Sequence, residues 1–271
     1  MDKDRGANKY DGFKYYQSKL YTDPESSYNS HYANYFKSFC KQYENVDNSQ
    51  YCIFDLQGAY GKWGCMIKNL VGAKKCIVTD YSDGMVEYGK TIQPEDEAEF
   101  YNLGFDESLT DERVTKHKYC GVLIKEAIHF TQPGYAEKLM NFLKNHCTEN
   151  AFILCNGVLT TKYWKETPIY FPPTAIESLK NMKYDDIDFA NECKELTKDN
   201  KEICVQYKIE PIRYKWSLED FVIFLANRNW SCMRPVPEEE LQQYIEFAKN
   251  QKLAEIEYDI YYGFIEIFKK K

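Results

Sequence analysis

One stretch of the chain limits its possible folds more than any other: a short apolar run that ends in an acid, then a turn of small residues, then a helical pattern. The apolar run is 52–54, the acid is Asp55, and the turn begins at Gln57. A second apolar run, 76–79, ends at Asp80. This order predicts a strand, a tight turn, a helix and a second strand. Open α/β sheets bind adenosine-type cofactors in this way, because turn glycines let the backbone approach the ligand and the second acid accepts hydrogen bonds from ribose hydroxyls.

The same stretch resembles the cofactor-binding region of class I S-adenosylmethionine (SAM)-dependent methyltransferases, whose usual signature is acid-x-Gly-x-Gly-x-Gly. Aligned on Asp55, the chain matches the acid and the last glycine, Gly61. Gln57 and Ala59 occupy the first two glycine positions, and the remaining glycine is displaced by one, while the segment 80–85 continues the pattern in register. We expect the Gln57 side chain to point outward or to contact the carboxylate end of the cofactor. The alternative is that it fills the methionine channel and prevents binding.

The resemblance implies a set of cofactor-binding residues near the ends of the predicted strands. They are Asp55, Gln57, Gly58, Ala59, Gly61, Asp80, Tyr81, Met85, Phe105, Asp106, Lys125 and Glu126. Asp55 would lie near the methionine end of the cofactor, and Asp80 would bind the ribose hydroxyls with Tyr81 beside the adenine. Each acid has a structural alternative: a helix N-terminus could satisfy Asp55, and Asp80 could cap the turn that follows it. Met85 is alternatively a core residue.

The fourth predicted strand supplies the candidate catalyst. Cys120 to Ile124 form a near-continuous apolar run, as in a strand buried on both faces, and Lys125-Glu126-Ala127-Ile128-His129-Phe130 follows. One branch of the methyltransferases has a similar Lys-Glu-x-Ile-His-His segment. Because the end of such a strand opens into the site and imidazole titrates near neutral pH, His129 is the candidate general base. A structural hydrogen bond is the alternative for His129, and a mutual ion pair is the alternative for Lys125 and Glu126.

Aromatic segments predict the substrate side of the site. The predicted substrate-binding residues are Tyr10, Tyr16, Trp164, Arg228 and Trp230. The first two belong to a tyrosine-rich N-terminal segment, and Trp164 lies in an aromatic, proline-rich loop. These segments would enclose a pocket for a small molecule. Arg228 and Trp230 could instead pack an insertion onto the sheet.

The predicted fold is α/β: a seven-stranded Rossmann-like methyltransferase sheet with helices on both faces, an antiparallel last strand, and a helical insertion between the last two strands. The strands are expected near 51–55, 76–80, 98–103, 120–125, 151–156, 203–210 and 257–268, and helices are expected over 216–227 and 238–250. Gly263 predicts a bulge or kink in the last strand. The expected single domain, 1–271, comprises an N-terminal helical cover at 1–45, a cofactor-binding core at 46–212, the insertion at 213–252 and the last strand at 253–271.

Composition excludes some partners. The formal net charge is −7 with both signs interspersed, so we expect neither nucleic acid nor a membrane surface as a partner. The ten cysteines include no Cys-x-x-Cys pair, which argues against a zinc site and for reduced thiols in a cytoplasmic protein. The start of the chain has no apolar signal segment.

The sequence therefore predicts SAM-dependent methyl transfer to a small-molecule acceptor by direct displacement, with S-adenosylhomocysteine (SAH) as product and no metal. A methyltransferase-like binding or interaction protein that has lost catalysis is the alternative, motivated by the missing glycines. A nicotinamide-dependent oxidoreductase fits less well, because Gly-x-Gly-x-x-Gly is absent. A nucleic-acid methyltransferase is disfavoured by the lack of basic surface and of an Asn/Asp-Pro-Pro-Tyr/Phe segment.

Overall fold

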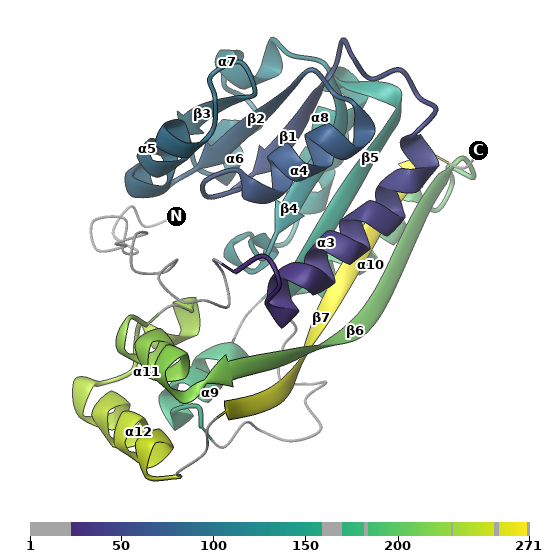
Figure 1. The fold of residues 1–271 in the computed structure, drawn as a ribbon. Coiled ribbons are helices and arrows are strands. Elements are labelled where there is room, and N and C mark those ends of the chain that lie inside the picture. Colours follow the sequence, from purple (N-terminus) through teal and green to yellow (C-terminus); the bar gives the residue numbers. More distant parts are fainter. Residues whose placement is uncertain (1–22, 159–169, 182–183, 229, 252–254, 270–271) are drawn as a thin grey trace.

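The computed structural model describes residues 23–158, 170–181, 184–228, 230–251 and 255–269. These residues form a seven-stranded sheet flanked by helices, and a smaller group of helices lies at the far end of two long strands (Figure 1). Three of the predicted substrate-binding residues, Tyr10, Tyr16 and Trp164, lie outside the described residues.

The sheet has the strand order β3-β2-β1-β4-β5-β7-β6. Its strands are β1 (Cys52–Leu56), β2 (Lys75–Asp80), β3 (Ala98–Asn102), β4 (Tyr119–Lys125), β5 (Cys147–Val158), β6 (Ile203–Ser217) and β7 (Glu255–Lys269). Strand β7 is antiparallel to both of its neighbours, whereas the pairs among β1 to β5 are parallel. The predicted methyltransferase-type sheet is confirmed, and the apolar run before Lys125 forms a central, buried strand.

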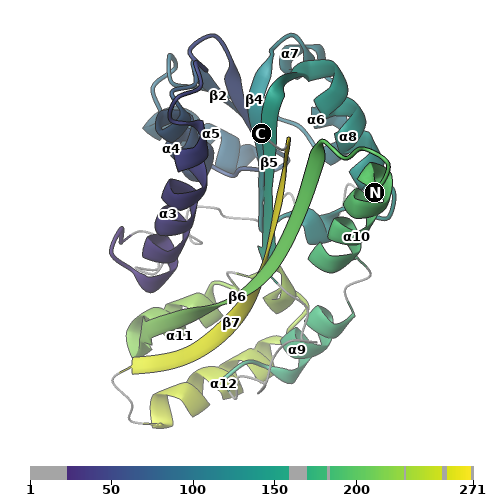
Figure 2. The same cartoon turned by 90° about the vertical axis from the view of Figure 1, so that its right-hand side faces the viewer.

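Helices cover both faces of the sheet (Figure 2). The larger ones are α3 (Ser27–Cys40), α4 (Lys62–Val71), α5 (Asp83–Ile92), α8 (Tyr135–His146) and α10 (Asp186–Thr197). Short turns of helix are η2 (Lys41–Tyr43), α6 (Phe105–Ser108), α7 (Glu112–Thr115) and η3 (Ile128–Phe130). Helices α3, α4 and α5 lie on one face, and α8 and α10 lie on the other.

Alternation along the strands builds one apolar core on each face. Ile53 and Val78 face the core shared with α3 and α4, whereas Phe54 and Ile77 face the core shared with α8 and α10. Because both faces of these strands are covered, their sequences are continuous apolar runs. The polar residues that follow the runs therefore gather where the strands end.

Strands β6 and β7 continue beyond β5 as a two-stranded ribbon, in which 211–217 pairs with 255–261. One side of the ribbon is buried and aromatic, with Tyr214 and Trp216, while Arg213 on the other side pairs with Glu257. This period-two alternation extends β6 through Trp216, which had been predicted to begin a helix.

The buried side of the ribbon carries a group of helices, here called the distal lobe (Figures 1 and 2). It consists of α9 (Pro173–Lys180), α11 (Leu218–Ala226), η5 (Ser231–Met233) and α12 (Glu238–Asn250). Helix α11 begins where the Ser217 side chain accepts a hydrogen bond from the Asp220 N–H, at 3.1 Å. Except for α9, the lobe lies between β6 and β7 in the sequence, as the predicted insertion does.

Of the bulge or kink predicted at Gly263, the bulge is absent, because the pairing register is continuous through this residue on both sides of β7. Gly263 and its cross-strand partner Gly157 instead make room for the Asp186 side chain. A Cβ atom would lie 2.9 Å from Asp186 Oδ2 at Gly263 and 2.4 Å from Asp186 Oδ1 at Gly157. Burial raises the pKa of the Asp186 carboxyl well above its ordinary value. The two glycines therefore allow the Asp186 side chain to lie close against the strand backbone.

Candidate functional site

The turn after β1 has left-handed backbone at the three positions where the methyltransferase signature has glycine. The φ angles are 59° at Gln57, 52° at Ala59 and 77° at Gly61. This conformation costs a residue with a Cβ atom about 1–2 kcal/mol, which is why glycine usually occupies it. Gln57 and Ala59 thus hold a left-handed backbone that glycine adopts without this cost.

Asp55 is enclosed by this turn and by the start of α4. A Cβ atom at Gly58 would lie 2.2 Å from the Asp55 carboxyl carbon, and one at Gly64 would lie 2.5 Å from Asp55 Cβ. The Gly64 N–H donates to Asp55 Oδ2 at 3.0 Å, so the helix N-terminus satisfies one oxygen, as the structural alternative predicted. Oδ1 is buried without a hydrogen-bond partner among the described residues. Burial raises the pKa of Asp55 to about 7.

Asp80 ties the turn to the end of β2. Its Oδ2 accepts a hydrogen bond from the Ala59 N–H, and its Oδ1 accepts one from the Ser82 N–H, each at 2.9 Å. The predicted capping contact is therefore present. Burial raises the pKa of Asp80 to about 6. Because each carboxylate oxygen has two lone pairs, these contacts leave acceptor capacity for ribose hydroxyls.

The Gln57 side chain turns toward the ends of β2 and β3. Its Nε2 donates to the Leu103 carbonyl at 2.9 Å, and its Oε1 accepts from the Tyr81 N–H at 3.2 Å. These contacts lie on the β2–β3 side of β1, and strand β4 lies on its other side. The Tyr81 ring, predicted to lie beside the adenine, is 40% exposed.

Three other predicted cofactor-binding residues, Met85, Phe105 and Asp106, differ in their surroundings. Met85 is buried on α5, and the Phe105 ring packs against Tyr135 in the core on the α8 face, with ring centroids 5.3 Å apart. Asp106 pairs with Lys138 at 2.8 Å. The position of Met85 matches its predicted structural alternative, and Phe105 directs its ring into the core rather than toward the turn.

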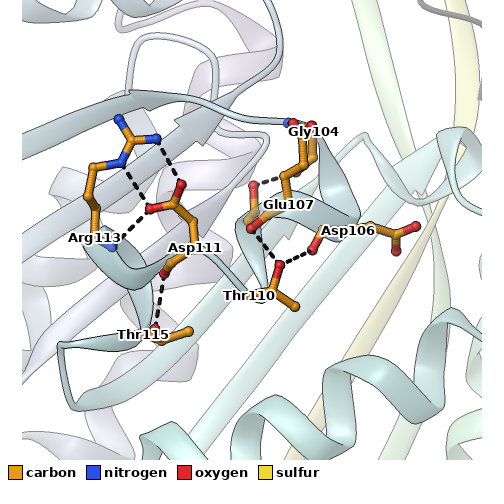
Figure 3. A network of polar contacts seen from close by, with 8 residues as sticks. Gly104, Asp106, Glu107, Thr110, Asp111, Arg113 and Thr115 are labelled. Atoms are coloured by element: carbon orange, nitrogen blue, oxygen red, sulfur yellow. Dashed lines mark hydrogen bonds and ion pairs between the residues drawn. The ribbon is translucent and has the colours of Figure 1, made fainter.

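A network of polar contacts fixes the two short helices that follow β3 (Figure 3). The Gly104 N–H donates to Glu107 at 3.1 Å, and Asp111 forms two hydrogen bonds with the Arg113 guanidinium, at 2.9 and 2.8 Å. The Asp106 carboxylate points away from this network. The segment is thus held by its own caps, and Asp106 remains at its surface.

Lys125 and Glu126 form the most enclosed charged pair of the site. Lys125 Nζ lies 3.0 Å from Glu126 Oε1, so the mutual ion pair is present. The same nitrogen lies 4.1, 4.6 and 5.7 Å from the ring centroids of Tyr32, Tyr28 and Trp63. We call the three rings and the Glu126 carboxylate the Lys125 cage. Aromatic faces and a carboxylate together stabilise a cation that has lost its water.

The cage is cross-linked by hydrogen bonds. The Tyr28 hydroxyl donates to both carboxylate oxygens of Glu126 at 3.1 Å, and the Tyr32 hydroxyl donates to Oε1 at 2.9 Å. Glu126 has left-handed backbone, with φ 53°, and its N–H donates to the Asn156 carbonyl at 2.5 Å. A glutamate in this conformation is strained, and such strain is commonly found at functional sites.

His129 follows the cage on η3. Both ring nitrogens are buried without a hydrogen-bond partner among the described residues, so the expected structural hydrogen bond is not seen there. Burial lowers the pKa of His129 to about 4, although the nearby Glu126 charge acts in the opposite direction. The imidazole is therefore neutral at physiological pH, and its lone pair is a weaker base than that of an ordinary histidine.

Arg228 and Trp230 lie in the distal lobe. The Arg228 guanidinium donates to the Met233 carbonyl at 3.0 Å and pairs with Glu238 at 2.9 Å. Trp230 stacks on Phe171, with ring centroids 5.3 Å apart. Trp230 also packs edge-on against Tyr214 of β6, with ring centroids 6.0 Å apart, which fits the alternative that it packs the insertion onto the sheet. The Arg228 contacts lie within the distal lobe, and a role of either residue toward a substrate stays a prediction.

Sequence reasoning did not single out Tyr28, Tyr32 and Trp63 as site residues. Tyr28 and Tyr32 are four positions apart, which places them on one face of α3, and Trp63 is the second residue of α4. The helical spacing was visible in the sequence. The pairing of that face with Lys125 depends on the packing of α3 against the sheet.

Among the described residues, no group of three or more histidine, cysteine, aspartate or glutamate side chains is arranged to hold a metal ion. None of the helices in those ranges is both long and apolar enough to cross a bilayer.

No protein-family model matches this chain, and a comparison with curated proteins finds no match. Solved structures do match. The plantazolicin methyltransferase BamL, with a triazolic desmethylPZN analog and SAH, is 12% identical over 96% of this chain and 90% of its own, with a TM-score of 0.54. BpumL, a plantazolicin methyltransferase with a monoazolic analog and SAH, is 12% identical over 96% of both chains, with a TM-score of 0.52. YcgJ from Bacillus subtilis is 12% identical over 89% of this chain and 99% of its own, with a TM-score of 0.55. The chain thus has the Rossmann-like fold of the class I methyltransferases.

Proposed function

We propose that the protein transfers the methyl group of SAM to a small-molecule acceptor by direct displacement, releasing SAH. The observation that carries this proposal is the turn after β1, whose backbone is left-handed at 57, 59 and 61 and is bound to Asp80. A turn that holds left-handed backbone at two residues with a Cβ atom supports a cofactor site at this turn. The structures of BamL and BpumL with SAH support SAM as the donor.

The chain's residues fit this cofactor along the ends of β1, β2 and β4. Asp80 has lone pairs for the ribose hydroxyls, and the exposed Tyr81 ring offers a face to the adenine. Asp55, whose buried Oδ1 has no hydrogen-bond partner among the described residues, would lie toward the methionine end. When bound, SAM supplies an electrophilic methyl carbon on a sulfonium. The protein holds the acceptor in line and excludes water, and His129 is the proposed proton acceptor.

The alternative is a methyltransferase-like protein that binds a partner and has lost catalysis. One observation favours it: the Gln57 side chain crosses the ends of β2 and β3, toward the proposed adenosine side. If that bridge blocks the cofactor, the turn geometry serves the fold alone.

A thermal-shift titration separates these functions. At about 100 times its dissociation constant, a ligand of the native state stabilises it by about 2.7 kcal/mol, which for a domain of this size raises Tm by about 5 °C. We expect SAM and SAH to give such a shift and NAD to give none. If millimolar SAM and SAH leave Tm unchanged, while Gln57→Gly combined with Ala59→Gly restores the shift, the active-enzyme proposal fails and the alternative is supported.

A further inference from the structure

The ammonium group of Lys125 occupies a site whose chemistry suits a methylated amine. The Lys125 side chain is only 7% exposed, and Nζ faces three aromatic rings within 5.7 Å. Methylation of an ammonium replaces N–H groups with apolar groups and keeps the charge, which aromatic faces continue to attract. The cage therefore matches the product of lysine methylation as well as the free lysine.

The position of Lys125 places its nitrogen beside the proposed cofactor site. Lys125 is the last residue of β4, which pairs with β1, and Asp55 at the end of β1 interacts electrostatically with the ammonium. Trp63, one of the cage rings, is the second residue of the helix that follows the turn. Nζ thus lies against α3 and near the acid that ends β1. Burial also lowers the pKa of Lys125, although Glu126 and Asp55 act in the opposite direction, and this favours the neutral amine that a nucleophile requires.

We propose that Lys125 is itself a methyl acceptor, so that the protein methylates its own chain at this residue. The inference rests on the proposed function, because it needs SAM as the sulfonium methyl donor. After a proton passes from Nζ to the Glu126 carboxylate, rotation about the Cε–Nζ bond turns the nitrogen lone pair away from Glu126, and the lone pair forms a bond to the methyl carbon. The carbon–sulfur bond breaks, its electron pair stays on sulfur, and SAH leaves. The nitrogen becomes a methylammonium, and Glu126 can return its proton to solvent.

The hydrogen bonds of the cage indicate how far the reaction should go. Nζ donates to Glu126 and to the Tyr28 hydroxyl, and the rest of the ammonium faces the rings. One methyl group on the ring side leaves both hydrogen bonds in place, whereas further methylation removes them in turn. We therefore expect monomethyllysine as the main product. Glu126 keeps its hydrogen bonds from Tyr28 and Tyr32 throughout.

Mass spectrometry of the whole protein tests this inference. Incubation of the wild-type chain with SAM should add about 14 Da, and fragmentation should place the added mass on Lys125. Excess SAH should suppress the gain. Lys125→Arg, which keeps the positive charge, should show no gain. Lys62→Arg is the matched control, because Lys62 is the neighbouring lysine whose pKa the Lys125 charge helps to lower, and this variant should gain mass as the wild type does.

A thermal-shift measurement with SAM and SAH accompanies each mass measurement, so that binding is read separately from methylation. A Tm shift without added mass overturns the inference and leaves the proposed function standing, as does a mass gain that persists in Lys125→Arg. If neither a shift nor a gain occurs in the wild type, the proposed function fails and this inference fails with it. Should Lys125→Arg not fold, Lys125→Met serves in its place, with its own melting curve as the check.

Discussion

The substitution Ala59→Gly tests whether the turn after β1 stores backbone strain. At φ 52°, Ala59 has a left-handed conformation that costs about 1–2 kcal/mol for a residue with a Cβ atom. Glycine removes this cost but makes the unfolded chain more flexible, which offsets about 0.4–1 kcal/mol of the gain in stability. The Ala59 N–H can still donate to Asp80, since glycine keeps the backbone donor. The net expectation is a stabilisation of about 0.5–1 kcal/mol, measured as a shift in the urea midpoint at an unchanged m-value.

Gly72→Ala is the matched control for this prediction. Gly72 has φ 66°, and a Cβ atom there would meet nothing within 4 Å, so only the backbone cost acts. Gly72→Ala should therefore destabilise the protein by about the amount that Ala59→Gly stabilises it. Gln57→Gly should stabilise the protein less than Ala59→Gly does, because it also removes two side-chain hydrogen bonds that contribute about 1 kcal/mol each. A clear loss of stability in Ala59→Gly, beside the expected loss in Gly72→Ala, would refute the strain argument.

Three further predictions concern single residues. The pKa of Asp55 is raised to about 7, so its protonated form stabilises the cofactor-free protein below pH 4, and this contribution of up to about 4 kcal/mol is lost as the pH rises to 7. In urea unfolding measured across this pH range, Asp55→Asn should flatten the pH dependence of the unfolding free energy, and an unchanged pH profile would contradict this prediction. His129→Ala should lower the rate of SAH release about 100-fold while the SAM-induced Tm shift persists. An unaltered rate would mean that His129 has only a structural role. Gly263→Ala should destabilise by about 1–3 kcal/mol because its Cβ would meet Asp186, and Asp186→Ala should restore part of the loss if the contact is the cause.

Much of the sheet was predictable from the sequence because its parallel strands are buried on both faces. The runs before Asp55, Asp80 and Lys125 are short, apolar and followed by polar residues, so their ends are marked along the chain. The extension of β6 was missed because aromatic residues at 214 and 216 fit either a helix or a ribbon until their partners in β7 are known.

The candidate site was predictable at the turn and less so at the Lys125 cage. Asp55 and Asp80 could be identified because acids at strand ends carry a local signal. The left-handed backbone at Gln57 and Ala59 could not, since neither residue type favours it. The cage joins residues 28 and 32 to residues 125 and 126, a pairing that depends on how α3 packs and that helical spacing alone does not encode.

The central claim, that the turn after β1 binds the adenosine end of SAM, is tested most directly by calorimetric titration of SAH into the wild-type protein and into Asp80→Ala. SAH is the suitable ligand because it cannot transfer a methyl group during the measurement. We predict one site per chain in the wild type. The Asp80→Ala variant should bind about 10–100-fold more weakly, as expected for the loss of charge-assisted hydrogen bonds to the ribose, provided that its melting curve shows a folded protein. No binding by the wild type, or equal affinity in the two folded proteins, would contradict the account.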